Sequence, residues 1–118
     1  MKQIRIERIN AEIKRTISEI IGGADYIDSA CMVTVVRVDT SGDLSYSDIY
    51  FSVFCTDANK RTAQFNVIAA NQKVIRRSLA AKMSSLRIVP DLRFHLDTSM
   101  EYSEKINELI AKLDDRKK

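Results

Sequence analysis

The chain has 118 residues, a formal net charge of +3 and 45% hydrophobic residues, which fits one domain with a single core. This composition excludes a disordered tail, and no apolar run reaches the ~20 residues that a membrane-spanning helix needs. One histidine and two cysteines are too few for a Cys/His zinc site, and three glycines fit no phosphate-binding loop. We therefore expect no Cys/His metal site and no His-based catalytic apparatus, and the common enzyme motifs are largely excluded. The N-terminus lacks a secretion signal, so we expect a cytoplasmic protein.

Charge is unevenly distributed along the chain. Residues 24–59 contain six aspartates and one arginine, whereas residues 60–93 contain eight basic side chains and one acidic one. A solvated helix surface made of good helix formers is one interpretation, but such a surface normally mixes both signs. The basic stretch therefore predicts a phosphate-binding face.

The first half of the chain predicts a helix followed by a hairpin. Isoleucines recur at steps of three and four between residues 6 and 21, as in an amphipathic helix, and Gly22-Gly23 ends it. Residues 32–38 are mostly β-branched and predict a strand. A turn cluster follows at residues 40–43, and apolar and polar residues alternate over residues 48–55. We therefore expect the second strand to pair back on the first.

The hairpin brings the two cysteines together. If it is symmetric about Asp43, Cys31 lies opposite Cys55. Because the cytosol is reducing, we expect two free thiols that behave as small hydrophobes.

The second half predicts helices around one more strand. Helical spacing returns between residues 65 and 83 but is interrupted at Asn71-Gln72-Lys73. One long helix fits, and two helices that meet at a kink near Asn71 fit as well, since Asn tolerates left-handed backbone angles. Residues 92–97 alternate as a strand, and Pro90 near its start favours an edge strand or a strand entry over the centre of a sheet.

The chain ends with a further predicted helix. Apolar residues at helical spacing over residues 102–113 predict this helix, and residues 114–118 are expected to fray. A three-stranded sheet with one solvated face needs helices on its other face. We therefore predict an α+β fold, a two-layer sandwich that forms a single domain over residues 1–118.

Several sequence pieces resemble those of a known family. In chain order they are Arg8-Ile9-Asn10-Ala11-Glu12-Ile13, Val33-Thr34-Val35-Val36-Arg37-Val38 followed by Asp43-Leu44-Ser45, Ile75-Arg76-Arg77-Ser78-Leu79, and Leu86-Arg87-Ile88-Val89-Pro90-Asp91-Leu92-Arg93-Phe94. Together with the element order, they resemble the ribosome-binding factor A family of bacterial ribosome-maturation factors, from about residue 5 to residue 113.

The resemblance implies a type II KH-like fold with a three-stranded sheet and an extra C-terminal helix. It also implies binding to free 30S small ribosomal subunits, late 30S maturation with 16S rRNA processing, and a role in cold adaptation. The implied partners are the 30S subunit and its 16S rRNA, and we expect a monomer. The resemblance further implies no enzymatic activity, no cofactor and no small-molecule substrate. KH modules clamp four nucleotides with a Gly-x-x-Gly loop, which this family replaces by an Ala-x-Gly kink. The matching stretch here, Ala70-Asn71-Gln72-Lys73, has no glycine, which argues against base-by-base readout.

The candidate RNA-binding residues follow from the basic stretch. We expect them to bind rRNA phosphates by shape and charge. The set comprises Lys73, Arg76 and Arg77 after the kink, Lys82 and Arg87 further on, and Arg5, Arg8, Lys14 and Arg15 of the first helix if its polar face lies on the same side. Asn71 and Gln72 are expected to hydrogen-bond sugars or base edges. Arg76 and Arg77 point about 100° apart on a helix, so one can face RNA while the other faces solvent or an acidic partner.

Other polar and aromatic residues have simpler interpretations. Arg37 and Arg93 are expected to pair with local aspartates, and His95 is expected to be an exposed strand residue. Three aromatic residues are candidates for a stacking platform, but we expect them to pack under helices or cover a sheet edge: Tyr46, Tyr50 and Phe54.

Three alternative functions remain on the sequence alone. They are a generic KH-like module for single-stranded RNA, a protein–protein adaptor that docks at an exposed sheet edge, and a small enzyme on a ferredoxin-like sandwich. The last is disfavoured because no strand precedes the first helix.

Overall fold

The computed structural model describes residues 2–83 and 89–98. Its elements are α1 (Lys2–Gly22), β1 (Cys31–Thr40), β2 (Tyr46–Cys55), α2 (Lys60–Ala70), α3 (Gln72–Lys82) and β3 (Asp91–Leu96). The predicted α+β order is confirmed as far as β3. The predicted C-terminal helix and the tail after it lie outside the described residues.

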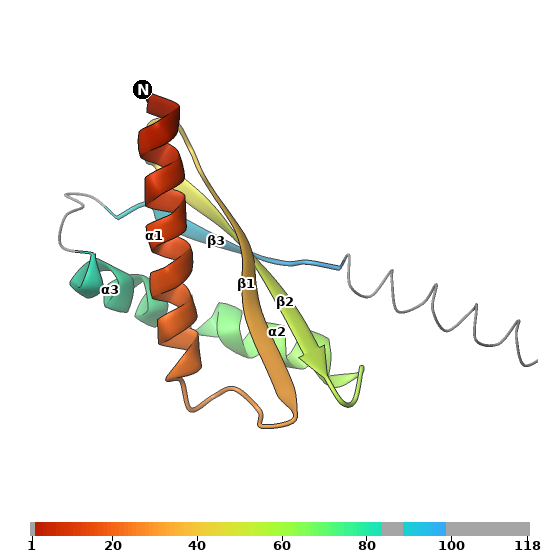
Figure 1. Ribbon diagram of the computed structural model, residues 1–118. Helices are drawn as coiled ribbons and strands as arrows, with labels where there is room; N and C mark the ends of the chain where they lie inside the picture. The colour runs from red at the N-terminus through yellow and green to blue at the C-terminus, as the bar shows by residue number, and fades with distance from the viewer. Residues whose placement is uncertain (1, 84–88, 99–118) are drawn as a thin grey trace, which may run out of the picture.

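The sheet joins a hairpin to a third, parallel strand. Its order is β1-β2-β3, with β1 antiparallel to β2 and β2 parallel to β3. Strand β3 therefore lies at an edge, as Pro90 predicted. Because β2 and β3 run in the same direction, α2 and α3 must carry the chain back along the sheet (Figure 1).

One face of the sheet is buried under the helices. Helix α1 packs on β1, α2 on β2 and α3 on β3. The core contains the predicted isoleucine stripe of α1 and alternate residues of the strands, with members Ile9, Ile13, Ile17, Ile21, Val35, Val38, Ile49, Phe51, Ile68, Ile75, Leu79, Met83 and Leu92. Burial of each large aliphatic side chain contributes about 1.5–3 kcal/mol, so this layer provides most of the stability.

The other face of the sheet, which we call the open face, points away from these helices. On β2 it consists of Tyr46, Asp48, Tyr50, Ser52 and Phe54, which alternate with the buried set. Of the two positions expected for the aromatic residues, packing under helices is wrong, because strand side chains alternate between the two faces. Once Ile49 and Phe51 occupy the core, their neighbours must point the opposite way.

The hairpin has the predicted symmetry over half its length. Partners run from Cys31–Cys55 to Val35–Phe51, and a bulge between Val35 and Arg37 then shifts the register by one residue.

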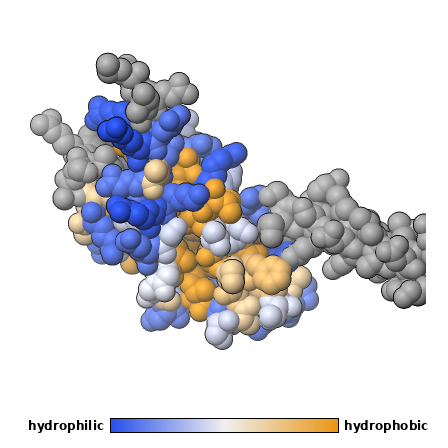
Figure 2. Space-filling view, viewed as in Figure 1, coloured by the Kyte–Doolittle hydropathy of each residue, from blue (hydrophilic) through white to orange (hydrophobic). Residues whose placement is uncertain are grey.

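The surface differs between the first helix and the first strand. Figure 2 shows hydrophilic side chains over α1 and a strip of apolar surface along β1.

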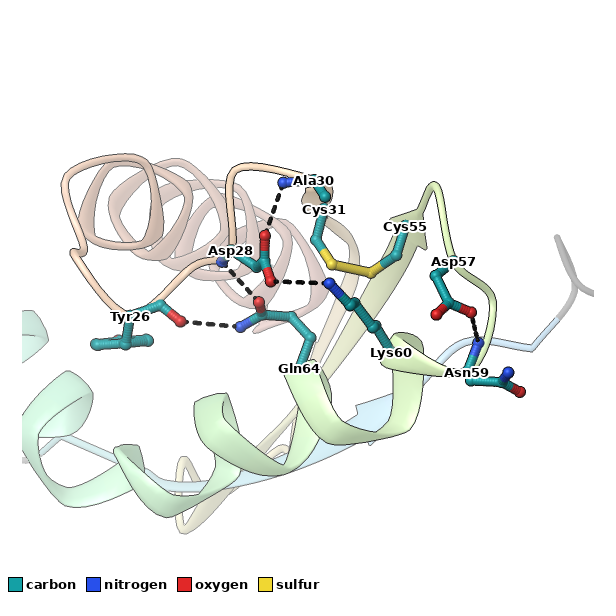
Figure 3. Close-up of a disulfide and its surroundings, with 9 residues drawn as sticks. All are labelled: Tyr26, Asp28, Ala30, Cys31, Cys55, Asp57, Asn59, Lys60 and Gln64. Carbon is teal, nitrogen blue, oxygen red and sulfur yellow. Dashed lines mark hydrogen bonds and ion pairs between the residues drawn. A yellow bond between two sulfur atoms is a disulfide. The ribbon is translucent and has the colours of Figure 1, made fainter.

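The two cysteines form a disulfide, so the expectation of free thiols is wrong. The hairpin register places them directly opposite each other, as the sequence predicted, and this proximity allows the bond. Figure 3 shows the disulfide beside the first turns of α2. There the buried Gln64 donates to Tyr26 O and accepts from Asp28 N, which fixes the loop before β1.

Two helices meet at Asn71, which confirms the kinked alternative. The backbone of Asn71 is not left-handed, since its φ is −96° and its ψ is 13°. Its side-chain Nδ2 donates instead to Val67 O at 2.8 Å, and its backbone N–H bonds the carbonyl groups at the end of α2. The residue therefore acts by capping the last turn of α2.

The disulfide closes a loop with a sequence separation of 24 residues, so reduction should destabilise the fold by about 3 kcal/mol. We expect urea unfolding of the oxidised chain to give a free energy of unfolding higher by about that amount than unfolding in reductant. The Cys31→Ser/Cys55→Ser variant should show no dependence on reductant. Equal midpoints for the wild-type chain in both conditions would contradict the prediction.

Candidate nucleic-acid interface

Three of the predicted basic residues lie together on α3. Lys73, Arg76 and Arg77 are spaced by three and four residues, so they share one side of the helix. With Ala80 and Val89 they line a surface hollow of about 490 Å³.

Arg76 is held by the chain itself. Its Nε donates to Pro90 O at 3.2 Å and its Nη2 to Val89 O at 2.8 Å, while Asp91 lies 3.6 Å from Nη2. These bonds tie α3 to the segment that leads into β3. The side chain nevertheless remains 44% exposed, so part of its guanidinium faces solvent.

Arg77 is exposed next to Arg76 on α3. The two neighbours point in different directions, as the 100° step predicted. Arg76 is turned toward the segment that leads into β3, and Arg77 faces solvent. Because Arg76 already donates to two carbonyl groups, Arg77 is the better candidate of the pair for binding an external anion.

Asn71 and Gln72 make bonds within the protein. The Asn71 amide caps α2, and Gln72 Nε2 donates to Leu92 O in β3. Both side chains are half-buried. Their nitrogen atoms thus position the start of α3, and their role in binding sugars or base edges stays a prediction.

The remaining candidate residues are dispersed around this cluster. Arg8 and Arg15 are exposed and seven residues apart on α1, so they point the same way. Arg5 and Lys14 are nine residues apart and therefore point to opposite sides of the helix. Lys82 is exposed at the end of α3. Arg87 lies outside the described residues.

The basic stretch of the sequence is thus divided among three places. Arg61 is buried and its guanidinium lies 5.7 Å from the Phe54 ring, while Lys60 lies 3.8 Å from Asp28. Arg93 lies on the open face. The predicted phosphate-binding face is therefore concentrated on α3, to which α1 is adjacent.

A polar network on the open face was only partly predicted. Arg93 donates from Nε and Nη2 to the two oxygens of Asp48 at 2.8 and 2.9 Å, and His95 Nε2 lies 2.8 Å from Asp48 Oδ1. The Arg93 hydrogen bonds lower the pKa of Asp48, and the His95 bond acts in the same direction. Tyr50 stacks on His95 with ring centroids 4.9 Å apart.

The second strand arginine is also paired. Arg37 Nε lies 3.0 Å from Asp39 Oδ2, so the prediction that Arg37 and Arg93 pair with local aspartates is confirmed. The His95 contact and the rings beneath both arginines had no signal in the sequence, because the residues come together only through the sheet register.

In the described part of the chain, no group of three or more His, Cys, Asp or Glu side chains is arranged so that it could hold a metal ion.

None of the helices described in residues 2–83 is long and apolar enough to cross a membrane.

Comparisons with known proteins find relatives that match most of the chain. A family model described as ribosome-binding factor A matches residues 5–110. Ribosome-binding factor A of Macrococcus caseolyticus is 36% identical over 110 residues, which cover 93% of this chain and 95% of that protein. The crystal structure of ribosome-binding factor A from Thermus thermophilus is similar with a TM-score of 0.64 and 22% identity, over 77% of this chain and 94% of that one.

A second set of coordinates of the Thermus thermophilus protein comes from a complex. It is a homology model of ribosome-binding factor A that was fitted into a cryo-EM map of a 30S complex of that protein, and it has a TM-score of 0.60 and 22% identity. It covers 75% of this chain and 91% of that chain. Both Thermus structures share the fold described above, and the structures of this family have a KH-like fold.

Arg76 and Arg77 should respond differently to truncation. Arg76→Ala removes the donors to Val89 O and Pro90 O and is expected to lower the free energy of unfolding by about 1 kcal/mol. Arg77→Ala, the matched neighbour, should leave stability unchanged. Urea unfolding of both variants checks this, and equal losses would refute the division of roles.

Asp48 should make stability depend on pH. Because its folded-state pKa lies below the unfolded value of about 3.9, its contribution is present above that pH and lost as the pH falls through the lower value. Asp48→Asn should therefore reduce the free energy of unfolding at pH 7, and the difference from wild type should shrink below about pH 4.

Asp25→Asn, in the exposed loop before β1, is the control and should have no effect at either pH. A difference between Asp48→Asn and wild type that stays constant as the pH falls well below 4 would contradict the role of the Asp48 carboxylate.

Proposed function

The chain belongs to the ribosome-binding factor A family, and from that premise we propose that it binds free 30S small ribosomal subunits and assists their late maturation. The contact is made with 16S rRNA, whose processing the binding assists. The chain acts as one domain and as a monomer in the cytoplasm, and it contributes no catalytic step of its own. The observation that supports this proposal most strongly is the basic cluster on α3, in a chain of this family.

The chemistry of α3 suits the backbone of folded RNA. Lys73 and Arg77 offer exposed cations at one helical turn's spacing, and Arg76 supplies a third that the β3 segment holds in place. RNA backbones are recognised by such phosphate contacts, which fix position and carry no base information. Arg8 and Arg15 on α1, together with Lys82 and Arg87, extend the contact.

Binding to folded rRNA favours one conformation of the particle. A ligand shifts an equilibrium only by its differential affinity for the two states. The protein therefore stabilises the conformer whose phosphates match α3. This mode of action needs no cofactor, and short single-stranded oligonucleotides, which lack that shape, should bind more weakly than the subunit.

Charge reversal on α3 tests the proposal. Arg77→Glu should reduce affinity for small subunits about tenfold near 0.1 M salt and lower the salt slope by about one, because a phosphate contact is lost. Lys60→Glu makes the same change in net charge at an exposed position on α2 and should have little effect. Co-sedimentation on sucrose gradients at several salt concentrations measures both.

The same gradients provide the contradicting outcomes. Absence of the wild-type protein from the free small-subunit peak at low salt would overturn the function. Equal losses for Arg77→Glu and Lys60→Glu would remove the α3 cluster from the contact.

A further inference from the structure

The two sulfur atoms of the disulfide differ in their access to solvent. Cys55 is buried, with 3% of its surface exposed, whereas Cys31 is half-buried. Cys31 also lines a surface hollow of about 450 Å³ between the loop before β1 and helix α2. Thiol–disulfide exchange begins when a thiolate reaches one of the two sulfur atoms, so access decides which of them is attacked. The cysteine that an external thiol can reach is therefore Cys31.

Hydrogen bonds hold the two cysteines together without help from the S–S bond. Cys31 and Cys55 are direct partners across the hairpin, and next to them Thr56 N donates to Ala30 O at 3.0 Å. Gln64 fixes the loop before β1 to α2 with two further bonds (Figure 3). The hydrophobic cluster under the helices includes neither cysteine. Reduction therefore leaves the two thiols adjacent in a folded chain, so the bond can form again.

The disulfide lies away from the basic cluster on α3. Cys55 is the last residue of β2, whereas β3 begins opposite Tyr46, the first residue of that strand. Arg76 bonds the segment just before β3 and so holds α3 near that end of the sheet. Because the two sites lie at opposite ends of β2, opening the disulfide lowers the stability of the fold and leaves the anchor of α3 in place.

We propose that Cys31 and Cys55 form a reversible redox site, and that a dithiol opens it by attack on Cys31 Sγ. Disulfides of cytosolic proteins are usually transient and serve catalysis or redox sensing. The physiological role therefore rests on the cytoplasmic location proposed above, whereas the chemistry of the site does not. Oxidation stabilises the fold and reduction destabilises it, so the surrounding dithiols set how long the chain stays folded.

The exchange takes two steps. A thiolate of the dithiol forms a bond to Cys31 Sγ, the Cys31–Cys55 bond breaks, and Cys55 Sγ leaves with the electron pair and takes a proton from water. The second thiolate of the reagent then attacks the reagent's own sulfur in this mixed disulfide and releases Cys31 in the same way. The chain gains two electrons and two protons, and the dithiol is oxidised to a disulfide. An oxidised dithiol reverses both steps.

Reduction kinetics test whether the bond opens in the folded chain. The probe is dithiothreitol, which is uncharged, because Asp25 and Asp28 line the hollow. We expect a rate proportional to its concentration that changes less than about twofold up to 1 M urea, whereas global unfolding increases about fivefold or more over that range. A rate that follows the unfolding equilibrium would show that the bond opens only on unfolding and would overturn the proposal.

Reoxidation tests whether the site is reversible. After dithiothreitol is removed, oxidised mercaptoethanol should restore the Cys31–Cys55 bond without denaturant, and the far-ultraviolet circular dichroism should keep its folded form throughout. A folded, reduced chain that does not form the bond again would overturn the reversibility of the site.

Trapping identifies the sulfur that is attacked. The oxidised wild-type chain is exposed briefly to mercaptoethanol and then alkylated, and trypsin cleavage after Arg37 places the two cysteines in different peptides. We expect mercaptoethanol on Cys31 and the alkyl group on Cys55 in about tenfold excess over the opposite arrangement, because access limits the attack. The excess should disappear in concentrated urea. Equal amounts in the folded chain would overturn the assignment of Cys31.

Single-cysteine variants give an independent measure of access. Cys55→Ser keeps only Cys31 and Cys31→Ser keeps only Cys55, and the uncharged reagent dithiodipyridine should react with the first about tenfold faster than with the second. Equal rates in folded variants would contradict the assignment, and the trapping experiment decides it if either variant fails to fold. None of these measurements uses ribosomal particles, so they can fail while the proposed function holds, and the reverse.

Discussion

Burial of a single sheet face under three helices is the constraint on which the other features depend. Ile49 and Phe51 are fully buried, and the two-residue period of a strand then fixes where Asp48 and Tyr50 point. A shift of one residue in β2 would bury Asp48 and expose the core. The division of the molecule into a basic helical layer and a sheet surface of paired charges and aromatic rings is therefore enforced by hydrophobic packing.

Helix α3 is fixed in place by hydrogen bonds from its own polar and basic side chains. Gln72 and Arg76 both donate to carbonyl groups around the start of β3, so α3 cannot rotate without breaking those bonds. Such anchoring preorganises the neighbouring cations, because less side-chain and backbone freedom is lost when they bind. A rigid cationic surface suits recognition by shape.

Much of the fold could be predicted from the sequence because its signals are periodic. The isoleucine steps of α1, the alternation in β2 and the symmetry that pairs Cys31 with Cys55 all appear in the structure. The direction of β3 could not be predicted, since alternation is the same in parallel and antiparallel strands. The disulfide could not be predicted, because a reducing cytosol favours free thiols even where two cysteines lie opposite each other in a hairpin.

The candidate site was predictable only in part. Residues spaced along one helix, such as Lys73 and Arg77, share a side by geometry alone. The bonds of Arg76 to Val89 and Pro90 and the contact of Arg93 with Asp48 join residues far apart in the chain, so local pattern gives no sign of them. Charge counts over a segment likewise cannot show that Arg61 is buried.

The parallel pairing of β3 with β2 joins residues that are far apart in the sequence. In the hairpin, a hydrogen bond joins Thr40 to Ser47, which are seven positions apart, whereas the bond between Arg93 and Asp48 joins residues that are 45 positions apart. Closing the longer loop loses more chain entropy, so attachment of β3 is a less local step of assembly than formation of the hairpin. The guanidinium of Arg76 donates to the segment that leads into β3, so it connects this strand to α3, the helix that precedes it in the chain.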